Sequence, residues 1–145
     1  MDFEVRELQD FDLEDPKDFF DTLSNLRDVG GLSSSEAKDI LLKINSQDCH
    51  VFVAVTPEGK IIGCATLVVE QKFIRHGGKC GHIEDVSVNK DCEGKGVGSA
   101  VVRKAVEFAK KFGCYKVILD SADYNVPFYE KIGFKKFENC MRLDL

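Results

Sequence analysis

The sequence predicts one mixed α/β domain, in which a single twisted sheet carries helices on both faces. The chain has 145 residues, which is about the size of one domain, so we assign residues 1–145 to a single unit. Hydrophobic residues make up 43% of it and charged residues 31%, as in ordinary globular proteins. Stretches of alternating apolar residues are interspersed with stretches that repeat every three or four residues, which indicates strands and helices in one chain.

The N-terminal part predicts a strand followed by two helices. Phe3–Leu8 alternates apolar and polar residues, as in a half-exposed strand. Across residues 15–31, apolar side chains recur at helical spacing between a Pro start and a Gly-Gly stop. The second helix begins at Ser33, where Ser33 and Glu36 have the spacing of a capping box.

The middle of the chain predicts three consecutive strands. Two β-branched runs, 51–55 and 60–70, are separated by residues 56–59, whose Pro and Gly fit a tight hairpin turn. A glycine-containing loop at 75–78 then leads into a third strand over 80–88. These three segments form the expected centre of the sheet.

The C-terminal part predicts the clearest helix of the chain, over residues 97–112, where apolar residues step by four, four, three and four and Gly113 supplies the stop. A short buried strand follows at 115–119, then a helix at 125–132, which the side chain of Asn125 can cap, and a last strand at 134–143. The expected order is therefore β-α-α-β-β-β-α-β-α-β.

Charge and hydropathy exclude several classes of function. The 20 basic and 25 acidic residues give a net charge of −5, and Lys and Arg occur at most in pairs, so we expect no nucleic-acid partner. The apolar stretch 61–69 falls far short of the roughly 20 residues that span a bilayer. No basic or apolar leader follows Met1, and six cysteines without Cys-x-x-Cys spacing predict free thiols, no metal and a cytoplasmic location.

A glycine-rich segment at the start of the long helix predicts an anion site. Free backbone amides and the helix dipole attract a phosphate there, and glycine lets it approach closely. A plain turn is the alternative. A P-loop does not fit, because Lys95 lies between the glycines rather than after them. The predicted pyrophosphate site comprises Glu93, Gly94, Lys95, Gly96, Val97, Gly98 and Ser99.

In the preceding strand, the apolar residues do not keep the two-residue alternation of a regular strand. Ile83 occupies an odd position, whereas Val86 and Val88 occupy even ones, so a regular strand would turn them to opposite faces. One inserted residue at Glu84-Asp85 would bring them into phase, and such a bulge opens a slot for an extended ligand. The alternative is a strand buried on both faces.

Together, residues 84–99 resemble the coenzyme A site of the GNAT superfamily of N-acetyltransferases. The resemblance implies that acetyl-CoA is the cosubstrate. It also implies that the strand residues Val86, Ser87 and Val88 pair with the pantetheine arm, while the glycine loop holds the pyrophosphate. Glu93 stands where the superfamily has Gln or Arg, so we expect its side chain to point to solvent and only its backbone to contribute.

Four further blocks, 72–74, 81–86, 113–120 and 125–133, resemble the glucosamine 6-phosphate N-acetyltransferases. This resemblance implies a homodimer with its active sites near the subunit interface. It also implies transfer of an acetyl group to the amine of an amino-sugar phosphate, on the route to UDP-N-acetylglucosamine. Arg27 and Arg75 replace a family threonine and histidine, and both changes add positive charge where a sugar phosphate would be held.

The resemblance also assigns roles to side chains. Tyr129 is implied to protonate the departing thiolate, although it could equally be a packing residue. Asp120 or Glu84 is implied to take the amine proton, and Asn125 to contact the coenzyme. The implied substrate contacts are Arg27, Lys72, Arg75, His82, Glu84, Asp85, Asp120 and Arg142.

Two other functions stay open at this point. The same fold could acetylate another primary amine, such as a lysine side chain, a protein N-terminus or a polyamine. It could also serve as a non-catalytic acyl-CoA-binding module. The basic residues Arg27, Lys72 and Arg75 favour an anionic substrate over a cationic one, and the presence of both Asp120 and Tyr129 favours catalysis.

Overall fold

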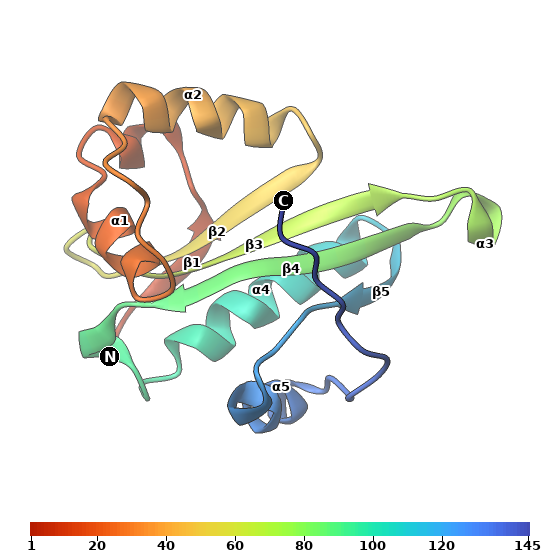
Figure 1. Cartoon of the computed structure of the whole chain (residues 1–145). Coiled ribbons are helices and arrows are strands. Elements are labelled where there is room, and N and C mark those ends of the chain that lie inside the picture. The colour runs from red at the N-terminus through yellow and green to blue at the C-terminus, as the bar shows by residue number, and fades with distance from the viewer.

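The computed structural model describes all residues 1–145 and contains one five-stranded sheet in the order β1-β2-β3-β4-β5 (Figure 1). Strands β1 to β4 pair with one another in antiparallel fashion, and β5 pairs parallel to β4. The expected hairpin turn at 56–59 joins two of them. The strands are β1 Glu4–Glu7, β2 Cys49–Val55, β3 Ile61–Gln71, β4 Lys79–Val88 and β5 Cys114–Ile118.

Helices cover both faces of the sheet, as expected. The side chains of Val51, Val53 and Val55 in β2 pack with those of α1 and α2, whereas Phe52 packs with α4 and α5 on the opposite face. None of the helices is long and apolar enough to cross a bilayer. The helices are α1 Lys17–Ser24, α2 Ser34–Asn45, α3 Ile74–Gly77, α4 Val97–Lys111 and α5 Val126–Ile132.

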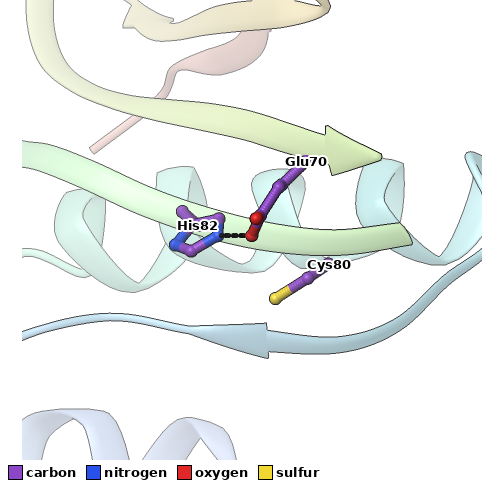
Figure 2. Close-up of side chains that lie close together, drawn as sticks. All are labelled: Glu70, Cys80 and His82. Carbon is purple, nitrogen blue, oxygen red and sulfur yellow. Dashed lines mark hydrogen bonds and ion pairs between the residues drawn. The ribbon is translucent and has the colours of Figure 1, made fainter. Parts of the chain in front are cut away.

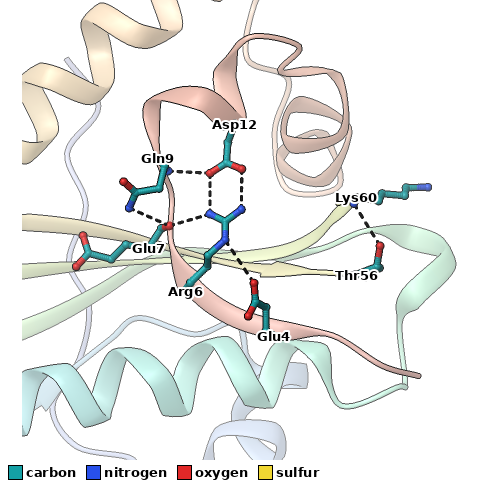
Figure 3. A network of polar contacts seen from close by, with 7 residues as sticks. All are labelled: Glu4, Arg6, Glu7, Gln9, Asp12, Thr56 and Lys60. Carbon is teal, nitrogen blue, oxygen red and sulfur yellow. Dashed lines mark hydrogen bonds and ion pairs between the residues drawn. The ribbon is translucent and has the colours of Figure 1, made fainter. Parts of the chain in front are cut away.

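A salt bridge fixes the chain between β1 and α1. Arg6 of β1 donates two hydrogen bonds of 2.8 Å to the Asp12 carboxylate in the 3-10 turn Asp10–Leu13 (Figure 3). Asp12 also accepts from the Gln9 backbone N–H at 2.8 Å. Planar guanidinium–carboxylate pairs of this kind fix orientation, so the turn that leads into α1 is held against the sheet.

A predicted helix end and a predicted strand differ from the structure. Helix α1 ends at Ser24 rather than near Gly30-Gly31. The loop predicted at 75–78 overlaps the short element α3, in which Arg75 and His76 have left-handed backbone angles, with φ of 57° and 56°. The strand expected at 134–143 is wrong for this chain, because residues 134–145 pair with no strand. Phe137 is 81% exposed and Met141 90% exposed. Alternating apolar residues form a strand only where they pair with a neighbouring strand, and residues 134–145 pair with none in the single chain.

Candidate active site

The bulge predicted in β4 is present. Cys64 of β3 faces Ser87, and Thr66 faces Glu84, so the single residue between them opposes both Asp85 and Val86. Asp85 has a φ of 50°, the left-handed conformation that a bulge of this type can require. As expected, Ile83, Val86 and Val88 lie with the residues that pack against α4.

From Ile83 onwards, just before the bulge, β4 has no second neighbour. Strand β5 pairs with β4 only from Lys79 to His82, whereas β4 continues to Val88. The Asn89 N–H donates to Ile62 O of β3 at 2.8 Å. Since N–H and C=O of one trans peptide point in opposite directions, the Val88 carbonyl faces the edge that β5 has left. Apart from the Val88 carbonyl, which accepts from Asn25 Nδ2 at 2.7 Å, this edge suits an extended ligand.

The glycine loop presents the free end of α4 beside this edge. Gly96 is the N-cap residue, has a φ of 83° and makes no side-chain cap, and Gly94 has a φ of 74°. The Gly96 carbonyl accepts from Ala100 N–H at 3.1 Å, so the helical bonds begin there and the first amides of α4 have no partner within the helix. Lys95 donates to Asp91 O at 3.1 Å, and Ser99 Oγ accepts from Arg103 at 3.2 Å.

Helix α5 packs closely against the same loop. A Cβ atom at Gly98 would meet Phe128 Cζ and Val88 Cγ2, each at 3.3 Å. A side chain here would push Phe128 or Val88 back by a few tenths of an ångström, so Gly98 allows the close approach of α5, which carries Tyr129 as the residue after Phe128. Asn125 precedes α5 as its N-cap, but its side chain makes no capping hydrogen bond. The carboxamide is thus exposed and available to a ligand, while the interpretation of Asn125 as a side-chain cap is wrong.

The carboxylates of Glu84 and Asp120 lie near one another at the point where β4 and β5 separate. Partial burial raises the pKa of Glu84, and the negative charges of Asp120 and Asp85 raise it further. The thiol of Cys140 lies beside Asp120, whose carboxylate raises the pKa of Cys140 through a hydrogen bond. The C-terminal segment therefore runs past this carboxylate pair, which the sequence did not indicate.

Tyr129 is half-buried among aromatic rings. Its ring meets Phe128 at 4.9 Å and Phe134 at 5.9 Å, both edge to face. Burial raises the pKa of the Tyr129 hydroxyl, which keeps the proton on the phenol well above neutral pH. Tyr129 thus combines a packing role with the protonation state that a proton donor needs.

A polar cluster lies on the paired half of β3 and β4. Glu70 Oε1 is 2.8 Å from His82 Nε2 (Figure 2) and 3.3 Å from Lys72 Nζ. These two partners, His82 first, lower the pKa of Glu70. Glu70, Cys80 and His82 are side chains of the kinds that bind metals. However, Lys72 already pairs with the same oxygen, so the contacts describe an ion-pair network.

Of the three arginines proposed for the substrate, two make contacts elsewhere in this structure and the third is exposed. Arg75, at the tip of the β3–β4 hairpin, lies over the Tyr115 ring at 4.8 Å. Arg142 pairs with Asp144 at 2.6 Å in the C-terminal segment, and Arg27 is exposed just beyond α1. Their assignment to the sugar phosphate therefore stays a prediction.

Sequence reasoning did not find the contacts that hold α1 to β4. Buried Ser87 donates to Thr22 O at 2.6 Å, and Thr22 Oγ1 donates to Ile61 O at 3.2 Å. Asn25 Nδ2 donates to Val88 O at 2.7 Å and to Glu93 Oε1 at 2.9 Å. The one feature of the sequence that could have indicated these contacts is Thr22, a polar residue on the apolar face of α1. Glu93 itself is exposed, as predicted.

Comparison with known families agrees with this geometry. The family model described as the acetyltransferase (GNAT) family matches residues 11–134. The chain belongs to the GNAT acetyltransferase family. The predicted fold class and the resemblance based on the bulged strand and the glycine loop are thereby confirmed.

Relatives of this GNAT acetyltransferase include a glucosamine 6-phosphate N-acetyltransferase of Trypanosoma brucei brucei. The two sequences are 37% identical over an alignment of 148 residues, which covers 100% of this chain and 97% of the relative. A glucosamine 6-phosphate N-acetyltransferase of Arabidopsis thaliana is 39% identical, over 90% of this chain and 89% of that protein. The crystal structure of glucosamine-6-phosphate N-acetyltransferase from Arabidopsis thaliana superposes with a TM-score of 0.92 at 34% identity, covering 99% of both chains.

Proposed function

We propose that this GNAT acetyltransferase transfers the acetyl group of acetyl-CoA to the amine of glucosamine 6-phosphate, giving N-acetylglucosamine 6-phosphate and coenzyme A. The observation that carries the proposal is the pair of carboxylates, Glu84 and Asp120, where β4 and β5 separate. An amine that attacks a thioester must lose a proton, and the pair stands beside the strand edge that suits the pantetheine arm. The names of the Trypanosoma and Arabidopsis relatives support the choice of acceptor.

The coenzyme fits the chain at two places. The uncapped amides at the start of α4, with Gly94 and Gly96 in left-handed conformations, suit the pyrophosphate. The exposed edge of β4 around Val86, Ser87 and Val88 suits the amide groups of pantetheine. The Val88 carbonyl already accepts from Asn25 Nδ2 at 2.7 Å, so we assign acetyl-CoA to the rest of this edge and to the first amides of α4.

The reaction we propose is direct transfer within a ternary complex. The chain holds the amine and the thioester in attack geometry, and a backbone amide near Val86 polarises the thioester oxygen. As the new C–N bond forms, Glu84 takes the amine proton while Asp120 orients the amine. As the C–S bond breaks, the Tyr129 hydroxyl gives its proton to the leaving thiolate. Glu84 is assigned as the base because burial and the neighbouring carboxylates raise its pKa, which makes it a stronger base than an ordinary carboxylate.

The anionic acceptor is supported by cationic side chains on the neighbouring part of the sheet. The cationic residues are Lys72, which is oriented by Glu70, and Arg75, which lies at the adjoining hairpin tip; His82, also bonded to Glu70, adds a polar side chain. A charge-assisted hydrogen bond to the sugar phosphate is worth about 1.5–3 kcal/mol. We therefore expect the phosphate to contribute at least about tenfold to kcat/KM.

The test is release of free thiol from acetyl-CoA with a panel of acceptors. Glucosamine 6-phosphate should react best, and glucosamine at least about tenfold less well, because it lacks the phosphate. Equal turnover of the two sugars would refute the phosphate contacts. Preferred turnover of spermidine or a lysine peptide would assign a different acceptor, and coenzyme binding without any turnover would indicate a binding module.

We further propose that the protein is a homodimer that acts in the cytoplasm. Exposed apolar side chains support the dimer: Phe73 and Ile74 at the hairpin tip are 101% and 63% exposed, and Leu143 in the C-terminal segment is 84% exposed. All six cysteines are free thiols, which supports a reducing compartment.

A further inference from the structure

Asn25, next to the C-terminal end of α1, joins three elements that are distant in the sequence. Its Nδ2 atom donates to Val88 O, 63 residues away, and to Glu93 Oε1, 68 residues away. One carboxamide thus connects the end of α1, the end of β4 and the start of the glycine loop. The mechanism above leaves this contact without a role.

The Glu93 carboxylate would interfere with the coenzyme if nothing restrained it. It belongs to the residue immediately before Gly94, in the loop that leads to the uncapped N-terminus of α4. Free amides and the positive end of a helix dipole attract carboxylates as well as phosphates. A mobile Glu93 side chain would therefore compete for the amides and repel an incoming pyrophosphate.

In the structure, Asn25 holds Glu93 by its Oε1 atom at 2.9 Å. The side chain of Asn25 is itself fixed by its second bond, 2.7 Å to Val88 O. That carbonyl lies on a strand that is paired with β3 on its other side, so it is a rigid anchor. The carboxylate is thereby kept on the α1 side of the loop.

We propose that Asn25 is a positioning residue for coenzyme binding, which holds the Glu93 carboxylate away from the amides at the start of α4. The inference rests on the proposed function, because it requires acetyl-CoA to bind at the glycine loop. Asn25 acts through Glu93 and needs no contact with the coenzyme.

The test is a double-mutant cycle measured by calorimetric titration of the full chain with acetyl-CoA. Asn25→Ala releases the carboxylate and should raise Kd about three- to tenfold, with a smaller effect at high salt because the repulsion is screened. Asn25→Asp adds a second negative charge and should raise Kd further. Glu93→Gln should lower Kd, and Asn25→Ala should have no additional effect in that background, since no charge is left to restrain.

Ser24→Ala is the matched control. Ser24 is the neighbouring exposed residue, and its Oγ atom bonds only Asp21 O within α1, at 2.7 Å, so Kd should not change. Equal weakening by Asn25→Ala in both Glu93 backgrounds, or no weakening in either, would overturn the inference. Failure of the unaltered chain to bind acetyl-CoA would instead overturn the proposed function, on which the inference rests.

Discussion

Tyr129 is the residue whose proposed role depends most directly on its surroundings. Its hydroxyl stays protonated because burial raises its pKa, so it can donate to a thiolate at neutral pH. Tyr129→Phe keeps the aromatic ring and its edge-to-face packing and removes only the hydroxyl group. We predict that kcat falls about 10²–10⁴-fold with little change in acetyl-CoA affinity. Near-normal turnover, measured where chemistry limits the rate, would defeat the assignment.

Glu84 and Asp120 differ in what their removal should do to the pH profile. Glu84→Gln should lower kcat about 10²–10⁴-fold at all pH values, because the base is lost. Asp120→Asn should leave a measurable rate and move the acid limb to lower pH, because it removes a negative charge that raises the pKa of Glu84. Loss of activity in Asp120→Asn, with a normal profile in Glu84→Gln, would show that Asp120 takes the proton.

At the scale of elements, the N-terminus of α4 should carry much of the coenzyme affinity. Gly96 has a φ of 83°, and a Cβ there would meet no atom within 4 Å, so a side chain would project into space left for the ligand. Asn tolerates the left-handed conformation better than other side chains. We predict that Gly96→Asn raises the Kd for acetyl-CoA by at least about tenfold, because the amides are shielded.

Gly113 provides the control for that substitution. It has a φ of 81° just beyond the other end of α4 and also has no atom within 4 Å of a built Cβ. Gly113→Asn introduces the same backbone strain about 20 Å from the loop, so thermal stability should fall similarly in both variants. Equal coenzyme affinity in the two variants would contradict the assignment of the pyrophosphate site to the glycine loop.

For the whole molecule, the C-terminal segment predicts self-association. Residues 134–145 form no strand in the single chain, and Phe137 and Met141 are almost fully exposed. Apolar residues in an unpaired extended segment usually require a partner. Light scattering at micromolar concentration should give twice the chain mass of 16.2 kDa.

Phe137→Asp should shift that equilibrium to the monomer, because it places a charge in the proposed interface. Leu42→Asp is the matched control, since Leu42 is a 67% exposed apolar residue of α2, outside the C-terminal segment. A monomeric unaltered chain, or dimers that survive Phe137→Asp, would contradict an interface formed by the C-terminal segment.

Features that follow from local chemistry could be predicted from the order of the residues alone. The parity of Ile83 and Val86 revealed the bulge, because a period of two allows no other way to bury both on one face. The helical period after Gly96 fixed α4, and the exposed position of Glu93 followed from its charge.

Tertiary structure decided what depends on contacts between distant segments. The strand expected after Phe134 does not form, because a strand needs a partner and local propensity does not supply one. The Asn25–Glu93 contact and the position of Cys140 beside Asp120 join segments that only the fold brings together. Such contacts leave no periodic signal, since each depends on a single side chain meeting another across the molecule.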